Sequence, residues 1–237
     1  MQDFHSGSPT HLATDAVCLV LMAAAVLFGR SLSEERERLL RRSWVVGIVV
    51  VQVVHLVLIV RDYDPQHSLP LHLCDVAVVA AALAIWTRTR VWRTLTYFWA
   101  IGFSSQAFLT PILEDGPAHV GFWVFWTTHL QVVGSTVYKV FVGGYRPNRR
   151  DFLVACAGTL FYGAVVFPID MLFGLNYGFI GQSDAYGAGT ILDHLPGWPW
   201  RPFVIYALGV AGMAVLWLVW PLASLASRRR RTGTRPS

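Results

Sequence analysis

Charged side chains are scarce in this sequence, and their scarcity excludes an ordinary water-soluble domain. Only 14% of the 237 residues are Asp, Glu, Lys or Arg, whereas a soluble domain carries about 25%. Hydrophobic residues make up 54% of the chain, and the mean hydropathy is +0.48. Because the apolar residues fall in continuous blocks rather than in alternation, the sequence predicts an all-α integral membrane protein.

Several motifs are also missing, and each absence removes a class of function. The chain has no internal repeat, no glycine-rich nucleotide loop and no HExxH or other close histidine pair for a metal. Its three cysteines, Cys18, Cys74 and Cys156, lie inside apolar blocks, so no disulfide framework is expected. We therefore expect no metal and no cofactor. The net charge of +5 indicates membrane topology and anionic lipid rather than nucleic acid.

Seven apolar blocks are long enough to cross a hydrocarbon core of about 30 Å, which takes roughly 17–25 helical residues. We expect one transmembrane domain over residues 1–237, with spans at about 12–29, 44–61, 69–87, 94–112, 119–142, 152–174 and 203–226. The first span is the weakest because Asp15 interrupts it. It is not expected to be a signal peptide, because no Lys or Arg precedes it.

The basic residues predict the orientation of these spans. Seventeen of the 19 Lys and Arg residues fall on one side, in alternate connections, in the C-terminal tail and, for Lys139, at the end of the fifth span. Only Arg61 and Arg201 fall on the other side. Basic residues accumulate on the cytoplasmic side of membrane proteins. The sequence therefore predicts an outer N-terminus and a cytoplasmic C-terminus.

Polar side chains within the blocks gather in the outer half of the predicted bundle. His55, Cys74, Gln106 and Asp170 lie near outer ends of spans. His129 lies deepest, roughly 12–15 Å in at a rise of about 1.5 Å per residue. Ionisable residues within a membrane are costly and commonly functional. We therefore predict a single polar cavity that opens towards the outer side.

Cys74 is placed where the third helix is expected to begin. Ser68 is a candidate N-cap and Pro70 suits the first turn, so Cys74 falls in the first two turns. The positive end of a helix favours a thiolate, which is the nucleophilic form of cysteine.

We expect the base that deprotonates this thiol to be a residue of another span. His72 and Asp75 are three residues apart and share a helix face, so we expect them to pair with each other. His129 or His55 would then take the proton of Cys74, as in other activated nucleophiles.

Each candidate also has a structural explanation, and the residues alone leave the choice open. A membrane cysteine is commonly a small apolar filler, which is our interpretation of Cys18 and Cys156. His55 and Gln106 would then only hold neighbouring helices together. For His129 we favour a functional role, because histidines near the midplane rarely occur without one.

A long outer loop, residues 175–202, ends in the proline-rich segment PGWPWRP. Such long connections are often functional, so the loop is either a lid over the cavity or an aromatic membrane anchor. Arg61 and Arg201 either clamp a lipid phosphate or extend along the lipid towards the headgroups.

Several segments together resemble the YwaF-type family of bacterial membrane proteins. They are LPLHLC (69–74), FSSQAFLTP (103–111), TTH (127–129), NYGF (176–179) and LDHLPGWPW (192–200). That family is related to the eukaryotic transmembrane protein 164, an acyltransferase that makes polyunsaturated ether phospholipids. It is more distantly similar to the androgen-induced-gene lipid hydrolases. The resemblance implies an integral membrane protein of a bacterial plasma membrane.

The resemblance implies that Cys74 carries an acyl group and that His129 supports it. The eukaryotic motif reads Asn-Pro-Cys-His, whereas the cysteine here lies in His-Leu-Cys-Asp, at residues 72–75. We therefore expect a CoA-independent phospholipid acyltransferase of the outer leaflet, with phospholipid and lysophospholipid as substrates. Gln106, Asn176 or backbone N–H groups would hold the oxyanion. The remaining supporting residues would be His72, Asp75, His55 and Asp170.

Two other functions fit the same residues. The first is a lipid hydrolase with the same Cys74 and His129, in which water accepts the acyl group. The second is a transporter or binding protein whose polar pocket holds a small solute. Transporters commonly show internal repeats and interrupted helices in matched halves, and neither is evident here.

Overall fold

The computed structural model describes residues 4–66, 68–113, 115–182 and 194–232, and these residues form an all-helical bundle. No strand occurs in these ranges. The helices are α1 (Pro9–Ser31), α2 (Glu34–Arg61), α3 (Leu73–Thr87), α4 (Arg90–Gly102), α5 (Val120–Phe141), α6 (Arg149–Phe173) and α7 (Arg201–Thr232). Two 3-10 helices, η1 (Ser104–Phe108) and η2 (Tyr177–Phe179), join them. The prediction of an all-α protein is thus confirmed, with one α-helix near each predicted span.

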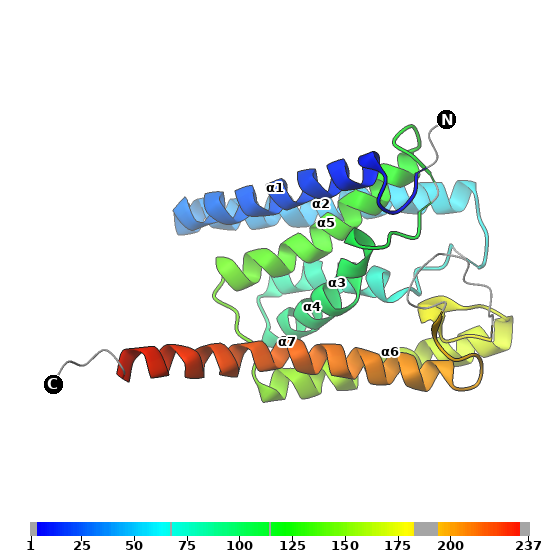
Figure 1. The fold of residues 1–237 in the computed structure, drawn as a ribbon. Helices are drawn as coiled ribbons and strands as arrows, with labels where there is room; N and C mark the ends of the chain where they lie inside the picture. The colour runs from blue at the N-terminus through cyan, green and yellow to red at the C-terminus, as the bar shows by residue number, and fades with distance from the viewer. Residues whose placement is uncertain (1–3, 67, 114, 183–193, 233–237) are drawn as a thin grey trace.

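The helices run roughly along one direction in three groups (Figure 1). Helices α1, α2 and α5 form one side, and α6 packs against α7 on the opposite side. The pair α3 and α4 lies between them, where α3 contacts α2 and α5 while α4 contacts α5, α6 and α7. The central pair is therefore enclosed by the other helices.

Four helices, α1, α2, α6 and α7, are long and apolar enough to cross a membrane. This supports the predicted integral membrane protein. Helix α5 has 22 residues but carries a polar stretch that includes Thr127, Thr128, His129 and Gln131. Helix α3 has 15 residues and α4 has 13. At about 1.5 Å per residue they reach only roughly 22 and 20 Å, short of a hydrocarbon core of about 30 Å.

Helix α3 begins at Leu73, four residues later than predicted, because a different residue caps it. The carboxylate of Asp75 accepts a hydrogen bond from the backbone N–H of His72 at 3.1 Å. Ser68 instead caps an earlier turn, where its hydroxyl accepts the N–H of Asp64 at 2.9 Å. The prediction that Ser68 is the N-cap of this helix and that Pro70 lies in its first turn is therefore wrong.

Helix α4 ends at Gly102, so the predicted span 94–112 is not one continuous helix. The hydroxyl of Ser105 donates to the carbonyl of Ile101 at 2.6 Å and competes with the helical pattern there. The chain then tightens into η1 and reaches Pro111, which cannot continue a helix. Both central helices are consequently short at the same end of the bundle.

Small residues of α3 allow the two central helices to pack closely. Ala77, Ala80 and Ala81 are almost completely buried, and Phe98 and Trp99 of α4 are buried as well. Small side chains let membrane helices approach each other, which increases their van der Waals contact. The core of the protein therefore lies around α3 and α4.

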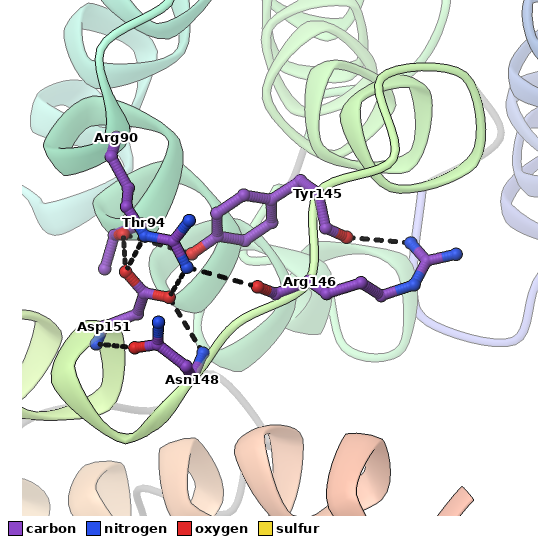
Figure 2. A network of polar contacts seen from close by, with 6 residues as sticks. All are labelled: Arg90, Thr94, Tyr145, Arg146, Asn148 and Asp151. Atoms are coloured by element: carbon purple, nitrogen blue, oxygen red, sulfur yellow. Dashed lines mark hydrogen bonds and ion pairs between the residues drawn. The ribbon is translucent and has the colours of Figure 1, made fainter. Parts of the chain in front are cut away.

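A buried polar network lies at the arginine-rich end of the bundle (Figure 2). Asp151 is 3% exposed, and its carboxylate accepts hydrogen bonds from Arg90 at 2.8 and 2.6 Å and from Thr94 at 3.0 Å. The same carboxylate accepts the backbone N–H of Asn148 at 2.8 Å. This acid thereby joins α4 to the start of α6. Buried polar groups thus lie at both ends of the bundle, not only in the predicted outer half.

Tyr145 extends this network from the connection between α5 and α6. Thr94 donates its hydroxyl proton to Asp151, so Tyr145 donates to the oxygen of Thr94 across 3.1 Å. Burial raises the pKa of Tyr145, so its hydroxyl stays a neutral donor. The network holds the connection against the core.

We expect Asp151→Ala to lower the free energy of unfolding by about 2–3 kcal/mol, because it leaves several buried donors without an acceptor. Thermal unfolding in detergent measures the change. Glu35→Ala is the matched control, because Glu35 is an exposed acid in the first turn of α2. An Asp151→Ala protein that unfolds at the wild-type temperature would contradict the structural role of this network.

Candidate active site

A cavity of about 1720 Å³ occupies the end of the bundle where α3 begins and α4 stops. Its walls come from the last turns of α2, the first turns of α3, η1, the first half of α5, the second half of α6 and the start of α7. The missing turns of the two central helices leave this space. The cavity lies at the end of the molecule opposite the C-terminal end of α7 (Figure 1).

Most of the residues predicted for the site line this one cavity. They are His55, Arg61, His72, Cys74, Asp75, Gln106, His129 and Asn176. They come from α2, α3, η1, α5 and the segments beside them, and the fold brings them together from distant parts of the chain. Two predicted residues, Asp170 and Arg201, are not in its wall.

Cys74 is the second residue of α3 and is partly buried at the cavity wall. Its Sγ lies 4.0 Å from Oδ1 of the neighbouring Asp75. Within the described part of the chain, no hydrogen bond joins this sulfur to a histidine. The thiol thus stands at a helix N-terminus, where backbone N–H groups favour a negative charge.

His129 of α5 also lines the cavity and is 8% exposed. Its Nδ1 is 2.8 Å from the carbonyl oxygen of Phe125, and the Phe125 ring lies 4.3 Å from the imidazole. Because a carbonyl only accepts hydrogen bonds, Nδ1 carries the proton in the neutral ring. Nε2 therefore has a lone pair, as a general base requires.

His72 and Asp75 contact each other in a capping box at the start of α3: the Asp75 carboxylate accepts the backbone N–H of His72 at 3.1 Å, and the His72 side chain accepts the backbone N–H of Asp75. The imidazole also packs edge-on against Tyr177 at 4.8 Å and lies 5.7 Å from Phe179. These contacts place His72 between the start of α3 and η2.

Asp170 contributes to the site indirectly, through Tyr177. Asp170 is completely buried, and its Oδ1 accepts the backbone N–H of Tyr177 at 3.0 Å. The Tyr177 hydroxyl then donates to the carbonyl of Pro65 at 2.7 Å and accepts the N–H of Leu69 at 2.8 Å. Burial raises the pKa of Tyr177, so this hydroxyl remains protonated and makes both contacts. Asp170 and Tyr177 together anchor the segment that leads to Cys74.

Tyr162 of α6 is a cavity residue that the sequence did not indicate. Its hydroxyl donates to the carbonyl of Leu71 at 2.7 Å, three residues before Cys74. The residue facing it, Gly178, has a φ of 64°, and a Cβ there would lie 2.7 Å from the Tyr162 oxygen. A lone tyrosine in an apolar helix carries no sequence signal of this role, whereas Tyr177 lies in the NYGF segment.

The two amides predicted for an oxyanion differ in their surroundings. Gln106 belongs to η1 and reaches the cavity with an exposed side chain. Asn176 also borders the cavity, and its Oδ1 accepts the N–H of Gly181 at 2.9 Å. His55 of α2 is half-buried at the wall. These three side chains therefore line the same cavity as Cys74 and His129.

The two outer arginines are not equivalent. The Arg61 side chain is 78% exposed, lies 3.9 Å from the Asp62 carboxylate and borders the cavity. Arg201 is 4% exposed, and its Nε donates to the carbonyl of Pro196 at 3.2 Å. Arg201 thus ties the end of the long loop to α7, whereas Arg61 presents a cation at the rim.

Part of the long loop, residues 183–193, lies outside the described residues, including the start of the LDHLPGWPW segment. The described end contacts the cavity through Trp198, whose ring stacks on Phe167 at 5.8 Å. Within the described chain, no group of three His, Cys, Asp or Glu residues is arranged to hold a metal ion.

Comparison with known proteins identifies relatives of this chain. The sequence model of the TMEM164 family matches residues 6–217, which include every residue of the cavity. A Treponema pallidum (strain Nichols) protein with the name "Uncharacterized protein" is 28% identical over 167 residues, covering 70% of this chain and 66% of that protein. The chain thus spans slightly less than two thirds of that relative's length. No solved structure matches.

We expect Tyr177→Phe to loosen the segment before α3, because it removes the hydroxyl that joins Pro65 to Leu69. The loss of these buried hydrogen bonds should cost about 1–2 kcal/mol of stability. It should also speed maleimide labelling of Cys74 severalfold in a protein whose other cysteines are alanine. Tyr63→Phe is the control, since Tyr63 is 58% exposed. Equal labelling rates in the two variants would show that Tyr177 does not position this segment.

Proposed function

The chain belongs to the TMEM164 family, and from this premise we propose that it is a membrane-embedded phospholipid acyltransferase that works through a thioester on Cys74. The observation that carries the proposal is the shared cavity, which is lined both by Cys74, at a helix N-terminus, and by His129, whose Nδ1 contacts the backbone and leaves Nε2 with its lone pair. The cavity is also larger than the roughly 300–1,000 Å³ of an ordinary small-molecule pocket. A lipid with long acyl chains needs such a volume.

The first half-reaction transfers an acyl group from a phospholipid to the protein. His129 Nε2 takes the thiol proton, and the Cys74 thiolate attacks the ester carbonyl of the bound lipid. The new S–C bond replaces the ester C–O bond, and the lysolipid oxygen leaves with the proton of the imidazolium. Such a covalent intermediate divides one difficult step into two easier steps.

The second half-reaction reverses these roles. The hydroxyl of a second lysolipid gives its proton to His129, and its oxygen attacks the thioester carbonyl. The C–S bond breaks, the new phospholipid carries the ester, and the Cys74 thiolate recovers the proton. The Cys74 sulfur lies 4.0 Å from Oδ1 of Asp75. We expect it to turn towards His129 when lipid binds, because catalytic contacts often tighten only in the complex.

The surrounding residues have supporting roles in this proposal. Gln106, Asn176 or backbone N–H groups would donate to the oxyanion of each tetrahedral intermediate. His55 would supply a further polar contact, and Asp75 would hold the first turn of α3 in place through its cap. Arg61, at the rim, would contact the lipid phosphate.

The proposed acyl donor follows from the proposed orientation. With the arginine-rich end in the cytoplasm, the cavity opens towards the outer leaflet. Acyl-CoA is a cytoplasmic compound, so a site on the outer side would take its acyl group from another lipid. The reaction would therefore be independent of CoA.

We expect incubation with phosphatidylcholine to place a fatty-acyl group on Cys74. Intact-protein mass spectrometry should show the added acyl mass, and hydroxylamine should remove it because thioesters are labile to this reagent. Cys74→Ala should lose the adduct, and Cys156→Ala, which removes another half-buried thiol, should retain it. His129→Gln should slow its formation by about 10²–10⁴-fold, as expected for the loss of a general base. No adduct in the wild-type protein, or an adduct that survives Cys74→Ala, would refute the proposal.

Labelled lysophospholipid separates transfer from hydrolysis. A transferase converts it to a labelled diacyl lipid, whereas a hydrolase with the same Cys74 releases free fatty acid. A transporter or binding protein forms neither product and no adduct.

We expect alkaline phosphatase to be inactive when fused after Ser237 and active when fused after residue 182, because the two positions should lie on opposite sides of the membrane. Enzyme activity in whole cells measures this, and green fluorescent protein at the same positions should give the opposite pattern. An active phosphatase after Ser237 would place the cavity on the cytoplasmic side and would remove the argument for CoA independence.

A further inference from the structure

A second, smaller pocket lies at the arginine-rich end of the bundle, away from the cavity that contains Cys74. Its volume is about 280 Å³. It is formed where the start of α2 meets the end of α3, and its lining residues are Arg38, Arg41, Arg42, Val45, Ile85, Trp86 and Arg88. Four of the seven are arginines, and none is acidic.

The positive charge of this pocket is only partly neutralised by the protein. Oε2 of Glu37 lies 2.7 Å from Arg41 and 3.6 Å from Arg88, so one carboxylate serves two guanidinium groups. Arg38 and Arg42 are exposed and have no ion-pair partner within the described ranges. The pocket therefore has an excess of cationic donors.

Lys139, the only lysine of the chain, adds a buried cation beside this pocket. It is 7% exposed and lies close enough to Arg41, Arg88 and Arg93 to interact with them electrostatically. No carboxylate lies within ion-pair distance of it in the part of the chain that the structure describes. Glu37 is the carboxylate that interacts with Lys139 electrostatically, and the same carboxylate already pairs with Arg41 and Arg88.

We propose that this pocket binds the phosphate group of an anionic phospholipid from the leaflet at this end of the protein. The planar guanidinium fork matches phosphate oxygens in two-point contacts, and Arg is the residue best suited to this. The phosphate supplies the negative charge that Glu37 alone does not. This site does not depend on the proposed acyl transfer.

The apolar part of the pocket favours a lipid over a free phosphate ion. Val45, Ile85 and Trp86 form the remaining wall, and Trp86 is 67% exposed. Exposed tryptophan is typical of the level of the headgroups, where its ring contacts lipid. A headgroup phosphate with its glycerol backbone can contact both the arginines and the apolar side chains, whereas inorganic phosphate can contact only the arginines.

The test compares two double variants that remove the same charge. The full chain is placed in nanodiscs of phosphatidylcholine with 20 mol% phosphatidylglycerol, and native mass spectrometry counts the phosphatidylglycerol retained after release. Arg38→Gln with Arg42→Gln removes two pocket arginines, and Arg149→Gln with Arg150→Gln removes two exposed arginines outside the pocket. We expect about tenfold weaker retention in the first variant and little change in the second, given a modest contribution from each basic residue.

Equal losses in both double variants, or no loss in either, would overturn the proposal, because binding would then follow net charge alone or lie elsewhere. Arg88→Gln is a second pocket variant and should also weaken the retention of phosphatidylglycerol. The test therefore still applies if the double variant fails to fold. Inorganic phosphate added to phosphatidylcholine nanodiscs distinguishes a free phosphate ion from a lipid headgroup as the ligand. If it raises the melting temperature as much as phosphatidylglycerol does, the ligand is free phosphate and the lipid assignment is wrong.

Discussion

The length of the two central helices is the constraint on which the rest of this structure depends. A helix that spans a bilayer needs roughly 20 residues, yet α3 has 15 and α4 has 13. Both are short at the same end, while the helices around them continue. The result is a hollow within a bundle that is otherwise well packed, and its floor is the helix N-terminus that carries Cys74. The cavity therefore exists because two helices stop early, not because the surrounding helices separate.

Non-helical backbone at membrane depth must have its polar groups satisfied by protein, and the segment before α3 meets this requirement. Tyr177 accepts the N–H of Leu69 and donates to Pro65, Tyr162 donates to Leu71, and the Asp75 carboxylate accepts the N–H of His72. Three side chains from separate parts of the chain thus replace the missing helical turn. The polar residues around the cavity consequently include some that hold the backbone and others that face the open space.

The two ends of the bundle differ in electrostatic design. At the cavity end, ionisable side chains border a large space and only Arg61 and Arg201 are basic. At the other end, Asp151 is saturated with hydrogen-bond donors while the nearby arginines and Lys139 outnumber their carboxylates. An acid saturated in this way stabilises the fold, whereas an excess of cations favours a ligand. The same arginines from which the sequence predicts the topology thus also line a pocket.

The sequence by itself determined the helical membrane class, the approximate positions of the seven helices, the family and the residues Cys74 and His129 as candidates, because apolar blocks and buried ionisable residues are local signals. The tertiary structure decided where α3 and α4 end, because the caps and turns there depend on side chains from other elements. It also decided that Asp170 acts through Tyr177, that Tyr162 belongs to the cavity and that Lys139 is buried beside arginines. Those properties are relations between distant residues, and no pattern along one segment encodes them.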